Sequence, residues 1–469
     1  MASNEMLGNE KVAPLLFKLA MPAIVAQLVN VLYNMVDRIY IGNMANSTNA
    51  LAALAVCLPL ITIISAFTRL VGLGGAPLCA IRMGQQRKEE ADRVMTTSFV
   101  LLIISSVVIM ILSMIFKEPL LMMFGADASC IEQAKSYLSI YVLGTLFVQL
   151  SIGMNAYITT QGFAKISMVT VMAGAIANII LDPIFIFWFD MGVQGAALAT
   201  IIAQAISFVW VMKFVFGPET VVRIRKKYLK PQARVVFAIV SLGISPFTMS
   251  ITESLLQITF NTQLSQYGGV MAISVMAILV SLWQFVTLPV DGFMQGAQPI
   301  MSYNYGAKNY QRVRDTFKLS FKVCIAYSFC IVSIIMIFAS TFAGFFSSDD
   351  ATVQLASWAI RIYMAGGLIY GIQMCCQNSF LALGQAKQSL AMAFYRKMVL
   401  LIPMLLILPG ILKDTSLAIT MGSTISSLVY DGGAVFTIFL CEAISDVLAC
   451  LTTGTLFYFF YRKHLKGLE

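Results

Sequence analysis

Long runs of apolar residues, separated by short polar segments, set the pattern of this chain from residue 14 to residue 461. Inside a lipid bilayer the backbone has no water to bond, so an apolar run of this length is stable as an α-helix. One helix needs about 20 mainly apolar residues to cross the hydrocarbon core. We therefore predict an all-α integral membrane protein with twelve transmembrane helices, at residues 14–41, 50–82, 93–116, 131–157, 166–189, 193–216, 236–262, 271–301, 314–343, 353–381, 388–411 and 432–461.

Basic residues between the predicted helices are divided unevenly between the two sides of the membrane. The opposite loops hold Lys117 and Lys413. Because cytoplasmic loops are enriched in Lys and Arg, the asymmetry predicts that both termini are cytoplasmic. We expect a multi-pass protein of the inner (plasma) membrane. The cytoplasmic set comprises Arg82, Arg87, Lys88, Arg93, Arg223, Arg225, Lys226, Lys227, Lys230, Arg234, Lys308, Arg312, Arg314, Arg462, Lys463 and Lys466.

Composition agrees with a lipid-facing surface. Hydrophobic residues make up 59% of the chain and charged residues only 11%, whereas about a quarter of the residues of a soluble domain are charged. The net charge of +9 arises mainly from the cytoplasmic loops. The net charge therefore indicates how the chain is oriented in the membrane. We expect the lipid bilayer as a partner and no nucleic acid.

The chain also repeats itself at an offset of 222 residues. The segment "QGFAKIS" at 161–167 aligns with "LGQAKQS" at 383–389, and several glycines, prolines and aromatic residues coincide at the same offset. Each half contains an even number of helices, so the two repeats cross the membrane in the same direction. We predict two pseudo-symmetric six-helix bundles, 1–216 and 236–469, joined by a basic cytoplasmic linker at 217–235. Paired bundles around a central cavity are a common plan among secondary transporters.

An acidic residue near the outer end of the first helix is unusual in so apolar a segment. Asp37 shares a helix face with Tyr33 and Asn34, one turn earlier. Arg38 follows directly, so a simple interfacial ion pair is the alternative interpretation. Adjacent helical residues point about 100° apart, which makes that pairing awkward.

Asp182 is a second isolated acid, in "ANIILDPIFIF" of the fifth helix, with Asn178 one turn before it. Pro183 removes a backbone donor, so a capped helix kink is the alternative role. A charged Asp at bilayer depth costs about 2.5–3.5 kcal/mol, and such groups mark ion pathways. Both Asp37 and Asp182 should lie in the outer half of the first bundle. There, burial and a second carboxylate both favour binding of a proton.

Several motifs in order resemble one transporter family. They are "LYNMVDRIYIG", "GLGGAPLCAIRMGQ", "NIILDPIFIF" and "GVQGAALATIIAQ". Together they are similar to the multidrug and toxic compound extrusion (MATE) family, and most of all to its bacterial MepA-like branch. The resemblance implies a twelve-helix antiporter that exports bulky, often cationic organic compounds in exchange for protons or sodium ions. It also implies that Asp37 and Asp182 are the ion-coupling acids of the first bundle.

The second bundle departs from the first. Asn261 stands opposite Asp37 and Met404 opposite Asp182, while Glu253, Glu442 and Asp446 are acids of its own. Glu442 and Asp446 are four residues apart and share a helix face. We take these three acids as a candidate ion or substrate site. Some family members bind sodium between acids on helices seven and ten. The tenth helix here has no carboxylate, so we favour protons, with sodium as the alternative.

Arg69 and Asp291 occupy equivalent positions at the 222-residue offset, in the cytoplasmic halves of the second and eighth helices. Equivalent positions meet when they lie near the symmetry axis. We therefore predict a salt bridge between the bundles that helps to close the cytoplasmic side. The alternative is that each side chain pairs within its own bundle.

The chemistry-bearing residues point to transport and not to catalysis. The only histidine is His464 in the tail, the nine cysteines show no metal-ligand spacing, and no nucleotide-binding loop is present. We expect no cofactor, no metal and no enzymatic activity. The expected function is multidrug efflux by proton-coupled alternating access, by a chain that acts as a monomer on small organic, cationic substrates. A flippase for lipid or polysaccharide precursors is the alternative.

Overall fold

The computed structural model describes the backbone of residues 3–42, 44, 47–124, 126, 130–347 and 349–466, and all regular structure in this part of the chain is helical. The apolar runs form long helices because each peptide group then bonds within its own segment. The helices of the first half are α1 Ser3–Asn9, α2 Val12–Gly42, α3 Ser47–Gly84, α4 Lys88–Met123, α5 Ile131–Leu143, α6 Thr145–Thr160, α7 Ala164–Pro183 and α8 Gly192–Val215, with a π-helical turn, η1 Ile184–Trp188, after α7.

The second half begins with the short 3-10 helix η2 Lys226–Tyr228 and continues as helices. The short helix α16 lies outside the predicted spans, whereas the short helix α11 falls at the end of the predicted span 314–343. The elements are α9 Ala233–Gly306, α10 Tyr310–Ile337, α11 Ala339–Gly344, α12 Asp350–Tyr363, η3 Ala365–Ile369, α13 Tyr370–Ala382, α14 Ala386–Phe394, η4 Tyr395–Leu401 (a π-helix), α15 Ile402–Leu412, α16 Ser416–Ser423, α17 Gly432–Tyr461 and η5 Arg462–Lys466.

Twelve spans follow from these helices. Among the described residues, nine helices are long and apolar enough to cross a membrane, and two bent helix pairs bring the number to eleven. The remaining span is hidden in α9, whose 74 residues are interrupted at Gly269. Gly269 has φ 72° and ψ −166°, a conformation that only glycine adopts without strain. The predicted twelve-helix, all-α membrane fold is therefore confirmed.

The backbone carries the same 222-residue repeat as the sequence. Gly162 and Gly384 follow equivalent helices with φ of 88° and 72°, and Gln86 and Lys308 have φ of 61° and 59°. The two bent pairs are also equivalent. One bends by 53° between α5 and α6, and the other by 41° between α12 and the helix that continues to Ala382.

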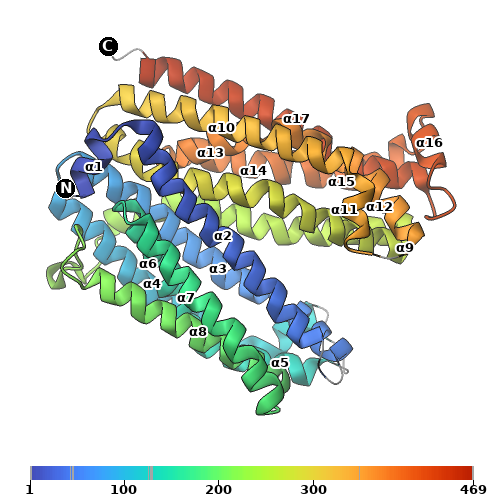
Figure 1. Ribbon diagram of the computed structural model, residues 1–469, viewed down its shortest axis with the longest axis horizontal. Helices are drawn as coiled ribbons and strands as arrows, with labels where there is room; N and C mark the ends of the chain where they lie inside the picture. The colour runs from blue at the N-terminus through green and yellow to red at the C-terminus, as the bar shows by residue number, and fades with distance from the viewer. Residues whose placement is uncertain are drawn as a thin grey trace. The chain divides into compact units, whose positions relative to one another are not determined.

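Two compact units are distinguished by their internal contacts. The first comprises Met1–Ser250, Gln295–Val313 and Leu381–Lys387, and the second Ile251–Met294, Arg314–Phe380 and Gln388–Glu469. In the first, α2 packs along α7, and α3 packs against α4, α5 and α6 (Figure 1). In the second, α17 packs against α12, α15 and α16. The division into lobes of 1–216 and 236–469 remains a prediction about which parts move together.

The basic connector after α8 is fastened to the first unit. Asp92 of α4, only 3% exposed, accepts hydrogen bonds from the Arg223 backbone N at 2.8 Å and from Arg225 Nε at 3.0 Å. Gln161 Oε1 accepts a further bond from the Val221 backbone N at 2.7 Å. The predicted linker is therefore, in its first part, an ordered strap along the helix ends of this unit.

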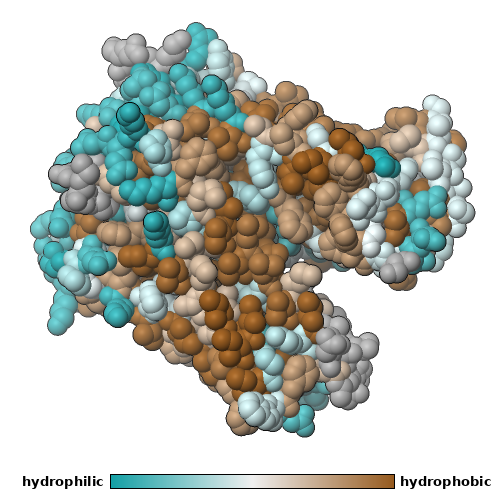
Figure 2. Space-filling view, viewed as in Figure 1, coloured by the Kyte–Doolittle hydropathy of each residue, from teal (hydrophilic) through white to brown (hydrophobic). Residues whose placement is uncertain are grey.

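The surface of the first unit has the polarity of a membrane protein. On the face shown in Figure 2, hydrophobic residues cover the middle of the helices and hydrophilic residues gather at the helix ends near α1. Exposed aliphatic side chains follow one another along α4, namely Ile104, Val107, Val108, Ile111, Leu112 and Ile115. Apolar side chains exposed in such numbers are stable only against lipid. The chain is therefore a multi-pass membrane protein.

Candidate functional site

The acid of α7 lies where that helix changes its geometry. Asp182 is followed by Pro183, the last residue of α7, and then by the π-helical turn η1. Proline lacks the backbone donor that a regular turn needs, so the chain widens after it. Single π-helical turns of this kind are frequent at functional sites.

Asp182 is sealed inside the first unit. The residue is 0% exposed, and Asn178, one turn earlier, is 2% exposed. Asn178 Nδ2 donates to Asp182 Oδ1 at 3.1 Å. The other carboxyl oxygen, Oδ2, is buried and has no hydrogen-bond partner in the part of the chain that the structure describes. A buried polar atom without a partner costs about 1–3 kcal/mol, so Oδ2 is a place where a proton or a cation would be stabilised.

The acid of α2 faces the same region. Because α2 packs along α7, Asp37 lies close enough to Asp182 for the two carboxylates to interact electrostatically. Asp37 is half-buried, unlike Asp182. Tyr137 of α5 interacts electrostatically with both Asp37 and Tyr33. The structure thus places Asp37, Asp182, Asn178 and Tyr33 together. The side chain of Asn34 lies outside the described residues.

This group of residues is suited to holding one exchangeable positive charge. Two carboxylates in electrostatic contact repel each other when both are ionised, and a proton on either one removes that repulsion. Asn178 can go on donating to Asp182 Oδ1 in both states, so it orients the carboxyl while Oδ2 changes its protonation. Asp37 is the more exposed of the two carboxyl groups.

A second charged group lies inside the second unit. Arg396 of η4 donates through Nε to Asp446 Oδ1 at 2.9 Å and through Nη2 to Glu442 Oε1 at 3.0 Å, both on α17. All three side chains are at most 7% exposed. The Ser445 hydroxyl also donates to the Arg396 carbonyl at 3.1 Å. This contact ties the backbone of η4 to α17.

The neighbouring cation, Lys397, binds the third of the acids predicted as a candidate site in the second bundle. Lys397 Nζ forms an ion pair with Glu253 of α9. Glu253, Glu442 and Asp446 were predicted as a group, whereas Arg396 and Lys397, which bind all three, were not predicted. The indication was present in the sequence. Two adjacent basic residues stand eleven and twelve positions into a 27-residue apolar span, where charged residues are rare unless they are paired or functional.

The two residues of the predicted cytoplasmic gate fall in different compact units. Arg69 of α3 belongs to the first unit and is exposed. Asp291 of α9 belongs to the second unit and interacts electrostatically with Tyr370. The salt bridge between them stays a prediction.

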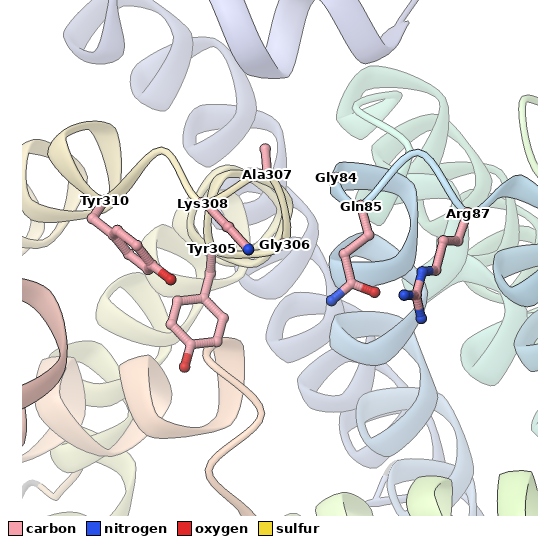
Figure 3. A pocket seen from close by; sticks show the side chains of 8 residues that line it. All are labelled: Gly84, Gln85, Arg87, Tyr305, Gly306, Ala307, Lys308 and Tyr310. Atoms are coloured by element: carbon pink, nitrogen blue, oxygen red, sulfur yellow. The ribbon is translucent and has the colours of Figure 1, made fainter. Parts of the chain in front are cut away.

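A polar hollow opens at the helix ends of the first unit, away from these carboxylates. Its volume is about 440 Å³. Figure 3 shows Gln85 and Arg87 on one side of it and Tyr305 and Tyr310 on the other. Arg87 is already paired with Glu90, at 3.3 Å. The hollow contains none of the predicted ion-coupling residues.

Comparison with known proteins places this architecture in a family. The family model MatE matches residues 22–184 and 247–407. A relative, the multidrug export protein MepA of Staphylococcus aureus (strain N315), is 27% identical over 390 residues, which are 83% of this chain and 85% of that protein. MepA of Staphylococcus saprophyticus is 25% identical over 412 residues, which are 87% of this chain and 90% of that protein.

A solved structure has the same fold. It is described as the outward-facing conformation of a multidrug resistance MATE family transporter of the MOP superfamily, with a TM-score of 0.88, 21% identity and 98% of each chain covered. Because the family model matches more than half of the residues in both halves, the chain belongs to the MatE family of multidrug and toxic compound extrusion proteins, and it is a transporter and not an enzyme.

Proposed function

We propose that this transporter exports small organic cations and takes up protons in exchange. The observation that carries the proposal is the Asp182 carboxyl, which is 0% exposed, has a buried Oδ2 without a partner among the described residues, and lies in electrostatic contact with Asp37. A group in this position holds a positive charge more readily than it holds none. Relatives of this chain are named multidrug export proteins, which supports small organic compounds as the cargo.

The exchange follows from competition for one negative site. When the pair of carboxyls holds a proton, its charge falls from two negative to one, and an organic cation is bound less well. When the proton leaves, the cation is bound better. Opening to each side of the membrane in turn then couples outward movement of the compound to inward movement of the proton. Exchange of one monovalent cation for one proton moves no net charge across the membrane, so the pH gradient, and not the membrane potential, drives it.

The parts of the molecule have separate roles in this scheme. Asp37, half-buried, exchanges protons with solvent, and Asp182, fully buried, retains the charge during the conformational change. The pair Arg69 and Asp291 closes the cytoplasmic side when the outer side is open. The protein works as a monomer in the inner (plasma) membrane with both termini in the cytoplasm, an orientation supported by the basic cytoplasmic loops.

Transport into proteoliposomes tests the coupling ion. Purified protein is reconstituted in vesicles with an acidic interior, and uptake of ethidium, a permanently charged cation, is followed by fluorescence with DNA trapped inside. Uptake should start with the pH gradient and stop when nigericin collapses it. A sodium gradient alone, at equal pH, should drive none. Uptake that follows the sodium gradient would show that sodium, and not the proton, is the coupling ion. Uptake that needs neither gradient would refute antiport.

A further inference from the structure

The second unit holds five charged side chains in one connected group, which we call the α17 cluster: Glu253, Arg396, Lys397, Glu442 and Asp446. Three of its members are bound tightly to one another. Arg396 contacts both Glu442 and Asp446, at 3.0 Å and 2.6 Å, and its guanidinium lies 5.0 Å from the centre of the Tyr370 ring. Arg396 is therefore fully engaged by these contacts, so we do not expect it to change its ion-pair partners.

Lys397 and Glu253 form the open end of the α17 cluster. The Lys397 side chain is 7% exposed, whereas the Glu253 side chain that it contacts is 64% exposed. The carboxylate is thus reached from outside, and the ammonium lies beneath it. A solute that carries a positive charge can approach Glu253 without moving any helix.

The exposed side of Glu253 is a polar face and not a lipid-facing one. Gln257, one turn later on α9, is also exposed, and residues four apart share a helix face. The apolar exposed residues of this stretch, Leu255 and Ile258, are turned by 140–200° from Glu253 at about 100° per residue. This division of apolar and polar side chains assigns the Leu255 and Ile258 face to lipid and the Glu253 and Gln257 face to water.

The charges of the α17 cluster leave room for one more cation. With all five groups ionised, two positive and three negative charges give a net charge of −1, and Asp291 adds a further carboxylate nearby through its interaction with Tyr370. Two buried oxygens, Glu442 Oε2 and Asp446 Oδ2, also have no hydrogen-bond partner among the described residues. Both carboxyls interact electrostatically with Lys397.

We propose that Glu253 binds the charged group of an organic cation and that Lys397 is the resident cation it displaces. On binding, the ammonium of Lys397 turns from Glu253 toward the partnerless oxygens of Glu442 and Asp446, which are polar and buried. The incoming charge brings the α17 cluster to neutrality. This inference rests on the proposed export of organic cations, and it adds a second binding site, distinct from the proton-carrying pair of Asp37 and Asp182.

An internal competitor has a particular consequence for affinity. Removing Lys397 should free Glu253 and make cations bind more tightly, whereas a merely structural ion pair would give no such gain. Binding of tetraphenylphosphonium to the purified full-length protein is measured by isothermal titration calorimetry, at one pH and without a gradient. We expect Lys397→Met to bind about threefold to tenfold more tightly than wild type, the size expected for losing a partly exposed ion pair.

Three further variants complete the test. Glu253→Gln should bind about tenfold more weakly, and the double variant Glu253→Gln with Lys397→Met should bind as Glu253→Gln does. Lys397→Arg, which retains the resident charge, should stay near wild type. Lys413→Met serves as the matched control, because it removes a lysine from another ion pair, 3.7 Å from Asp431, and should change nothing.

The outcomes are decisive in both directions. Unchanged or weaker binding by folded Lys397→Met, or an equal gain for the neutral analogue triphenylphosphine oxide, would overturn the proposal. If Lys397→Met does not fold, Glu253→Gln decides, because its side chain is exposed, and wild-type affinity in that variant would overturn the proposal. Because no gradient is present, these results are independent of which ion drives transport.

Discussion

Replacing Arg396 with methionine should strongly destabilise the second unit. The guanidinium is 7% exposed and is the shared partner of Glu442 and Asp446, which are 3% and 0% exposed at their side chains. Methionine fills a similar volume, so the main effect is that two carboxylates lose their counter-charge inside the protein. Removing one partner of a buried ion pair costs about 3–5 kcal/mol. For a unit of this size each kcal/mol lowers Tm by about 2–4 °C, so we expect a decrease of about 6–20 °C.

The assay is thermal unfolding of the purified protein in detergent, followed by intrinsic fluorescence and by the recovery of monodisperse protein. The control is Arg361→Met, at an exposed arginine of the same unit. Adding Glu442→Gln and Asp446→Asn to Arg396→Met should restore most of the lost stability, because no uncompensated charge then remains. A single variant that melts within about 2 °C of wild type would refute the role of Arg396 as counter-charge.

Further predictions concern the connector, a helix end and the gate. Asp92→Ala removes the acceptor of Arg223 and Arg225, so trypsin should cut the connector several-fold faster than in the control Glu118→Gln, which changes an acid of the same helix that pairs with Lys135; equal rates would show that Asp92 does not hold the connector. The hydroxyl and then the backbone N–H of Thr352 hold the pKa of Asp349 below its usual range. Its contribution to stability is therefore complete at neutral pH and is lost as pH falls through that lowered pKa. Asp349→Ala should lower Tm at pH 7, and the difference in Tm from wild type should vanish in acid. A difference in Tm that does not depend on pH would show that the ionised carboxylate is not its cause. Exchanging Arg69 and Asp291 in one protein should restore the ethidium uptake that is lost when only one of the two charges is reversed. Absence of this rescue would refute the predicted salt bridge of the gate.

The spans could be predicted from the sequence because lipid imposes one solution on a long apolar run. Length and polarity therefore located the helices, although some ends differ from the predicted ones, as for α4, which ends at Met123 and not at 116. The seventh and eighth spans were predicted as separate helices with a loop at 263–270. The structure joins them almost without interruption, because Gly269 supplies the turn at a single residue. The short helix α16 was not expected, since eight residues are too few for an apolar pattern to be distinctive.

The candidate site could be predicted only where its members share a helix. The contact between Asn178 and Asp182 follows from their spacing of four residues, as does the common face of Glu442 and Asp446. Pairings between helices needed the structure. The sequence shows Arg396 and Lys397 in an apolar span, but it does not show that α17 and α9 bring their carboxylates to them. The functional role of Asp37 and Asp182 stays a prediction.

The most direct test of this account is proton-driven uptake of ethidium by the double variant Asp37→Asn with Asp182→Asn. Asparagine retains the shape of both side chains and removes the groups that carry the proton. In vesicles with an acidic interior, uptake should fall to the level of vesicles without protein, while the Tm in detergent stays within a few degrees of wild type. Uphill uptake at the wild-type rate would contradict the account.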